Sequence, residues 1–403
     1  MHGGNRVLSI MIVSILLLSQ NVSGESAVTL GEKLSLSDED LGLEGLVIDG
    51  NKESVIVYGS NGYLRVLNAS NPVNQIELIW PGSHTLLDGD FHPRSETAFI
   101  VGEGGLILRY AKQDHSIERA AAESSFMFSE LTAVAWNTGG SWAYIGSEEG
   151  HLWRMRVAED GGAETHVLAG SGNSKITDID CHISIMMCVV VSTVDGIGII
   201  ERDHTFTWVG GTGYSWTGVE CPDGATNICV AVADNKILAT IELDSNDISK
   251  SIPEISSLSG VDAYFVGIDH QYGDRTIISL TPSGLIEHDI SINASFPWLE
   301  NSDIDDLNLT SSGIIGIWSV DKNSGWIVTN RGSLFEYKPP SEKPTELIHI
   351  WATISIPLAT LLVILSLIVS ASPKTRMWLS ESFSKKEPIN KKIRSSRRSK
   401  RKK

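Results

Sequence analysis

The sequence predicts an all-β fold, a seven-bladed β-propeller, that stands outside a membrane on a single C-terminal transmembrane helix. Three observations lead to this prediction: a strand-and-turn pattern that recurs seven times, an apolar run of twenty-five residues near the C-terminus, and an apolar N-terminal stretch that ends like a signal peptide. The 403 residues are enough for one large domain or two ordinary ones.

The recurring pattern is an apolar strand, a tight turn and a second alternating strand. Its seven copies are VIVYGSNG (55–62), AFIVGEGG (98–105), AYIGSEEG (143–150), CVVVSTVDG (188–196), CVAVADNK (229–236), IISLTPSG (277–284) and WIVTNRG (326–332). Successive copies end 40 to 48 residues apart, a period that is typical of one four-stranded propeller blade per repeat. An irregular β-sandwich is the alternative. The polar segment 161–175 is expected to be a loop between two blades.

The strand before each copy is expected to be the innermost strand of its blade, beside a central channel. One position of this strand is mostly small, as crowding around a channel requires: Gly45, Gly89, Ala133, Asp178, Gly218, Gly267 and Gly316. Two residues later the repeats read Val47, Phe91, Ala135, Asp180, Glu220, Asp269 and Trp318.

The last repeat ends near Tyr337 and shows only three strands, whereas the alternating segment 27–37 has no blade of its own. An open ring would leave two unpaired strand edges. We therefore expect segment 27–37 to form the outer strand of the seventh blade, within a propeller that covers residues 25–338.

The N-terminus has the layout of a secretory signal peptide, expected over residues 1–24. Arg6 precedes the apolar run Val7–Leu18, and small residues stand just before Glu25. An uncleaved membrane anchor is the alternative.

The C-terminal part predicts a membrane span. Residues 347–371 contain no Asp, Glu, Lys or Arg and are long enough to cross a bilayer. A linker, 339–346, precedes the span, and a basic tail, 372–403, follows it. A buried helix of a soluble domain is the alternative.

Charge sets the expected orientation. Residues 373–403 contain 13 Lys or Arg and 2 Glu, a net charge of +11, so a chain of net charge −17 leaves −28 for residues 1–372. The positive-inside rule places the tail in the cytoplasm and the propeller outside. Beside a span, the tail is expected to contact lipid headgroups rather than to act as a nucleic-acid arm. The acidic ectodomain, expected to be monomeric, argues against nucleic-acid binding.

The four cysteines predict two disulfides. Cys181 and Cys221 end innermost strands, and Cys188 and Cys229 open the next strands. In a hairpin such positions face each other, at the roughly 5.5–6 Å between Cα atoms that disulfides favour. The expected pairs are Cys181–Cys188 and Cys221–Cys229. A four-cysteine metal site and crossed pairing between blades are the alternatives.

Two blocks, GVECPDGATNICVAVADNKIL and DFHPRSETAFIVGEGGLILRY, resemble repeats of the photosystem II assembly and stability factor type of propeller, within the WD40/YVTN-like superfamily. The resemblance covers roughly residues 40–338. It implies a seven-bladed binding or assembly factor rather than an enzyme. The chain departs from this type in its C-terminal span and in lacking the T-x-D-G-G-x-x-W repeat ending.

Carboxylates on the innermost strands are the candidate ligand-binding residues. Asp178, Asp180, Glu220 and Asp269 come from three consecutive repeats. Converging carboxylates suit a hard cation such as Ca²⁺; a solvated acidic lining is the alternative, and no other cofactor is expected. The pairs Asp88-Gly-Asp90 and Asp269-His270 also lie on innermost strands.

The sequence contains no Asp-box, nucleophile elbow, HExxH or P-loop motif. Six tryptophans on strands are expected in the core between blades, or as a glycan-stacking platform in one or two cases: Trp136, Trp142, Trp153, Trp216, Trp318 and Trp326. Three sequons predict glycosylation at Asn68, Asn293 and Asn308.

Two functions remain. The first is a membrane-tethered scaffold, on the cell membrane with its propeller outside, that binds an extracytoplasmic protein or glycan. The second is an extracytoplasmic hydrolase or lyase that uses carboxylates at the channel mouth.

Overall fold

A computed structural model describes residues 26–158, 162–261, 263–282, 284–299, 304 and 312–339. The predicted signal peptide, the span 347–371 and the tail 372–403 lie outside these residues. None of the helices within the described ranges is long and apolar enough to cross a bilayer.

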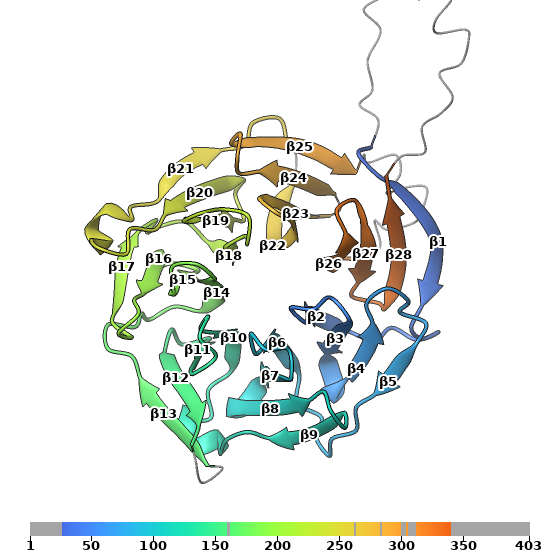
Figure 1. The fold of residues 1–403 in the computed structure, drawn as a ribbon, viewed down its shortest axis with the longest axis horizontal. Helices are drawn as coiled ribbons and strands as arrows, with labels where there is room; N and C mark the ends of the chain where they lie inside the picture. The colour runs from blue at the N-terminus through green and yellow to red at the C-terminus, as the bar shows by residue number, and fades with distance from the viewer. Residues whose placement is uncertain are drawn as a thin grey trace, which may run out of the picture. The chain divides into compact units, whose positions relative to one another are not determined.

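The described chain forms seven four-stranded antiparallel sheets arranged as a ring (Figure 1). In blades 1 to 6 the strands follow chain order from the innermost strand outward. The seven-bladed β-propeller predicted from the repeats is therefore confirmed.

The bounds of the strands in blades 1 to 3 are β2 (Leu43–Ile48), β3 (Ser54–Gly59), β4 (Leu64–Asn68), β5 (Gln75–Glu77); β6 (Leu86–Phe91), β7 (Thr97–Gly102), β8 (Leu106–Ala111), β9 (Ser116–Arg119); β10 (Leu131–Trp136), β11 (Ala143–Ser147), β12 (Leu152–Val157) and β13 (Ala163–Val167). Those of blades 4 to 6 are β14 (Ile176–His182), β15 (Met187–Ser192), β16 (Ile197–Ile200), β17 (Phe206–Gly210); β18 (Trp216–Glu220), β19 (Ile228–Ala233), β20 (Ile237–Glu242), β21 (Glu254–Ser257); β22 (Tyr264–Tyr272), β23 (Arg275–Thr281), β24 (Leu285–Asp289) and β25 (Ala294–Leu299). Blade 7 contains β26 (Ile314–Asp321), β27 (Ser324–Thr329), β28 (Ser333–Lys338) and β1 (Thr29–Ser35). Short 3₁₀ turns occur at η1 (Ser60–Gly62), η2 (Glu103–Gly105), η3 (Glu123–Phe126) and η4 (Ile248–Lys250).

The N-terminal strand closes the ring. β1 pairs antiparallel with β28, with Thr29 opposite Lys338 and Ser35 opposite Ser333. Two backbone hydrogen bonds extend this attachment, from the Ala27 amide to the Trp298 carbonyl (3.0 Å) and from the Leu36 amide to the Gly332 carbonyl (2.9 Å). The expectation that segment 27–37 supplies the outer strand of blade 7 is confirmed.

Seven apolar clusters fill the spaces between neighbouring blades, one at each interface. The second strand of a blade is buried on both faces, so it is apolar at most positions. In β19, Cys229 and Ala231 pack towards blade 4, whereas Val230 and Val232 pack towards blade 6. This double burial explains why the second strands gave the clearest repeat in the sequence.

The six tryptophans singled out in the sequence are all buried, with no more than 9% of their surface exposed. The expected place in the core between blades is confirmed for five of them, whereas Trp142 is buried against Arg154, Arg156 and His204. None of the six forms an exposed platform for a glycan.

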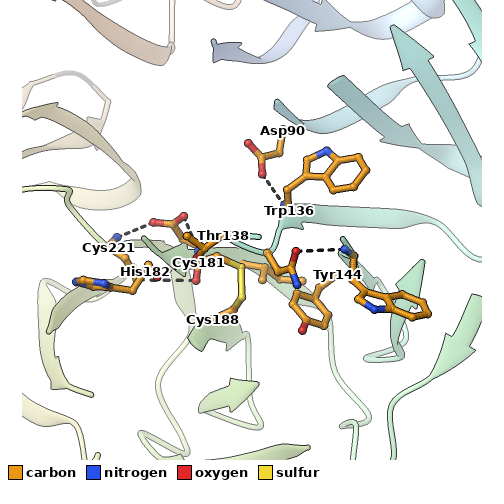
Figure 2. Close-up of a disulfide and its surroundings, with 12 residues drawn as sticks. Asp90, Trp136, Thr138, Tyr144, Cys181, His182, Cys188 and Cys221 are labelled. Carbon is orange, nitrogen blue, oxygen red and sulfur yellow. Dashed lines mark hydrogen bonds between the residues drawn. A yellow bond between two sulfur atoms is a disulfide. The ribbon is translucent and has the colours of Figure 1, made fainter. Parts of the chain in front are cut away.

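Both predicted disulfides are present, Cys181–Cys188 in blade 4 (Figure 2) and Cys221–Cys229 in blade 5. The Cα atoms are 3.9 and 4.1 Å apart, closer than the expected 5.5–6 Å. Cys181 lies directly opposite Cys188 in the ladder between two paired strands, and directly opposite residues that exchange no backbone hydrogen bonds approach most closely. Disulfides of this kind point to an oxidising, extracytoplasmic compartment.

Replacing Cys181 and Cys188 together by serine is expected to lower the free energy of unfolding by about 2 kcal/mol or less, because the closed loop is short. Denaturant titration of the full-length protein measures the loss. Non-reducing peptide mapping of the variant should still recover the Cys221–Cys229 peptide pair; a scrambled map would contradict two independent hairpin crosslinks.

The expectation of a loop over 161–175 is wrong in part, because β13 (Ala163–Val167) is the outermost strand of blade 3. This strand pairs on one side only, with β12, and two of its residues at most are partly shielded from solvent. A strand that contacts no core needs no apolar alternation, so its sequence resembles that of a loop.

Candidate functional site

The innermost strands of the seven blades surround a central cavity of about 410 Å³. All four carboxylates predicted as ligand-binding line this cavity: Asp178 and Asp180 from β14, Glu220 from β18 and Asp269 from β22. The fold therefore brings together residues that are up to 91 positions apart in the chain. Ligand binding by them remains a prediction.

The cavity contains three further carboxylates, Asp88 and Asp90 of β6 and Glu44 of β2. Sequence alignment of the repeats placed Gly89 and Phe91 in the two channel-facing columns, which is wrong by one residue. Every innermost strand has a register irregularity near its start, after its first paired residue or, in β22, after its second. In blade 2 this irregularity lies between Leu86 and Asp88.

When the residues of each strand are numbered from the irregularity, Asp88 has the same repeat position as Asp178, and Asp90 has the same position as Asp180. The Asp-x-Asp spacing common to blades 2 and 4 was the signal that could have given the correct register.

The paired aspartates fasten each of these blades to the next one. Asp88 Oδ2 accepts a hydrogen bond from the Val134 amide (2.7 Å) and Asp90 Oδ2 accepts one from the Trp136 amide (2.7 Å; Figure 2). These amides belong to β10, the innermost strand of blade 3.

Blade 4 repeats the arrangement towards blade 5. Asp178 Oδ2 accepts from the Val219 amide (2.8 Å), and Asp180 Oδ2 accepts from the Cys221 amide (2.6 Å; Figure 2). We call these four residues the aspartate clasps. Hydrogen bonds to a carboxylate are among the stronger ones in proteins, so the clasps give this part of the cavity a structural role.

The carboxyl groups of the cavity titrate far from their ordinary range. Burial raises the pKa of each of five groups to about 7, and mutual repulsion adds to the effect, whereas the backbone amides oppose it; the five are Asp88, Asp90, Asp178, Asp180 and Asp269. All five are partly exposed to the cavity. Near neutral pH the five carboxyl groups are therefore partly protonated and their titrations are coupled, so they do not carry five full negative charges.

Glu220 differs from the aspartates around it. Burial raises its pKa well above the usual range, followed by repulsion from Asp180 and Asp269. Within the described ranges no group donates a hydrogen bond to its carboxylate. Glu220 is thus a carboxyl group of the cavity that does not fasten one blade to the next.

The lining of this cavity includes no lysine, arginine or histidine from the part of the chain that the structure describes. Among the same residues, no three His, Cys, Asp or Glu side chains are grouped closely enough to hold a metal ion. The arrangement can exchange protons and attract cations, but these residues do not form a Ca²⁺ coordination shell as they stand.

Two of the three predicted glycosylation sites lie on the surface. Asn68 ends β4 and Asn293 lies in the turn before β25, and both are exposed. Asn308 lies outside the described residues. Glycosylation at these positions remains a prediction.

No protein-family model matches the chain, and no curated protein matches it. The structure supports the resemblance to assembly-factor propellers at the level of the seven-bladed fold alone.

Proposed function

We propose that the chain is a membrane-tethered scaffold whose seven-bladed ring binds a protein or glycan partner outside the cell. The observation that carries this proposal is the closure of the ring by its own N-terminal strand, together with two disulfides. Such a ring is a rigid platform suited to an oxidising compartment, and seven-bladed propellers commonly serve as binding scaffolds.

The tether is part of the same proposal. The apolar segment 347–371 would hold the scaffold in the membrane, with the tail 372–403 in the cytoplasm.

The tether is tested by adding protease to intact cells. We expect the propeller to be removed while an epitope placed after Lys403 is spared, and permeabilised cells should lose the epitope too. Loss of the epitope from intact cells would contradict the orientation.

A hydrolase or lyase is the second candidate, and one observation favours it. Carboxyl groups whose pKa is about 7 are suited to general acid–base catalysis, and such groups collect at functional sites. The aspartate clasps account for four of these groups by a structural role, and the Asp269 carboxylate also accepts a hydrogen bond from the Ile317 amide of blade 7. Glu220, which accepts no such bond from the described residues, and Asp269 remain as the candidates for acid and base.

Crosslinking in the native membrane separates the two functions. If the protein is a scaffold, a crosslinker should capture a partner in constant proportion to the full-length protein. The double variant Glu220→Gln, Asp269→Asn should then turn over glycosides and polysaccharides no more slowly than the wild type does. Turnover by the wild type that this folded variant lacks would replace the scaffold with the enzyme.

A further inference from the structure

Arg154 is an arginine of this acidic domain that has, among the residues described, neither an acidic partner nor a hydrogen bond to its side chain. Arg154 of β12 is partly buried, and its Nε is buried without a hydrogen-bond partner. Of the described groups, none forms an ion pair or hydrogen bond with its guanidinium. A buried N–H donor without a partner is costly, so the position of Nε requires an explanation.

The neighbouring blade shows what the partner ordinarily is. Arg109, on the third strand of blade 2, lies opposite Glu118 and forms an ion pair with it at 3.1 Å. In blade 3 the residue opposite Arg154 is His166. The repeat therefore keeps the arginine but replaces its carboxylate with an imidazole.

Aromatic packing holds Arg154 in place. Tyr144, Arg154 and His166 are cross-strand neighbours on β11, β12 and β13, so they lie in one row on the same face. The Arg154 guanidinium lies 4.7 Å from the ring centroid of Trp142, which is itself buried. This stacking orients the guanidinium without neutralising it.

Blade 4 contributes a second polar group from across the interface. His204, in the turn between β16 and β17, has a φ of +73°, a left-handed conformation that is uncommon for residues other than glycine. Its Nδ1 is 2.7 Å from the Tyr144 hydroxyl. Burial lowers the pKa of His204, and the charge of Arg154 lowers it further. With Tyr144 donating to Nδ1, the neutral ring carries its proton on Nε2 and has a donor to offer.

A cavity of about 520 Å³ lies against these groups, lined by Arg154, His166, His204, Val167, Phe206 and Asp203 among others. Its size is within the range of small-molecule sites.

The acids nearby already have partners. Glu164 binds Arg156 at 2.6 Å and His166 at 2.9 Å, and Asp203 is exposed and accepts a hydrogen bond from the Thr205 amide at 2.9 Å. The Arg154 guanidinium, which is partly buried, and the exposed Asp203 carboxylate are thus the charged groups of this cavity that form no ion pair with a described residue, and only Arg154 can attract an anion.

We propose that this cavity between blades 3 and 4 binds a small ligand, about the size of one sugar ring, through an oxyanion that Arg154 and His204 hold. A guanidinium presents parallel N–H donors that match two oxygens of a carboxylate, sulfate or phosphate. The site is separate from the channel and does not depend on the scaffold function.

Calorimetric titration of the full-length protein in detergent tests the site with three probes: inorganic phosphate, inorganic sulfate and glucuronate. We expect saturable binding of at least one probe, and Arg154→Gln should weaken it at least tenfold. The matched control Arg109→Gln, which removes an arginine that has an acidic partner, should bind as the wild type does. Preference for glucuronate identifies a carboxylate ligand, and preference for an inorganic ion identifies a tetrahedral one.

His204→Asn, a substitution that tolerates the left-handed backbone, keeps the test valid if Arg154→Gln does not fold. It should also weaken binding, whereas Arg154→Lys, which keeps the charge but loses the fork, should give an intermediate affinity. Absence of saturable binding of all three probes to the wild type overturns the proposal, as does wild-type affinity in folded Arg154→Gln or His204→Asn.

Discussion

Deletion of residues 25–37 is expected to lower the thermal midpoint of the propeller by roughly 10 °C. The deletion removes Val28 and Leu36, which are 4% and 7% exposed and pack into the clusters on the two sides of blade 7. Burial of two such side chains contributes about 3–6 kcal/mol. The deletion also exposes the β28 edge and leaves blade 7 with three strands.

Differential scanning calorimetry of the full-length protein in detergent measures this effect. The matched control is Glu32→Ala with Lys33→Ala, which changes two exposed side chains of β1 while keeping the strand, and its midpoint should equal that of the wild type. An unchanged midpoint in the deletion variant would show that the ring is stable without its closing strand.

Substituting Asp178 and Asp180 by asparagine is expected to stabilise the protein at pH 8 and to stabilise it less at pH 5. Their native pKa of about 7 lies above the usual 3.9 of unfolded aspartate, so the native state binds more protons between about pH 4 and 7. The stability that these groups contribute is therefore complete below about pH 4. It decreases as the pH rises from 4 to 7 and is lost above pH 7.

Asparagine keeps an oxygen that can accept from the amides of Val219 and Cys221 but carries no charge at any pH. The gain at pH 8 should be on the order of 2–4 kcal/mol for the pair, after allowance for screening by water in the channel. Denaturant titrations at both pH values measure it, with exposed Asp38→Asn as a control that should change neither. Destabilisation of the double variant at pH 8 would mean that the ionised clasps hold the blades together.

The second strands and the closing strand could be predicted because burial fixes their residues. Double burial makes a strand such as β19 apolar throughout, and the exclusion of open edges assigns segment 27–37 by counting alone. The disulfides follow from the same hairpin geometry. Strand β13 could not be predicted, since one-sided pairing on the surface leaves its composition free.

The candidate site could be predicted only in part, because a register irregularity shifts all later positions of a strand by one. The residues Asp178 and Asp180 were placed correctly, whereas Asp88 and Asp90 were assigned to an innermost strand but, because Gly89 was misaligned, were left out of the predicted ligand-binding set. The cavity beside Arg154 had no sequence signal at all. It depends on a missing carboxylate opposite an arginine and on a histidine from another blade, and neither is visible before the strands are paired.

The pairing of β1 with β28 also has a consequence for the time course of synthesis. Thr29 and Lys338 are 309 positions apart, and a chain is made from its N-terminus, so β1 emerges first and its partner last. Throughout that interval the first strand has no place to pair and blade 1 lacks a neighbour on one side. A chaperone that holds an extended strand would have its longest opportunity here, and release of β1 would be the final step of maturation. A chain whose synthesis stops before Ser333 would therefore contain blades 1 to 6 and an unpaired β1, whatever the stability of the complete ring.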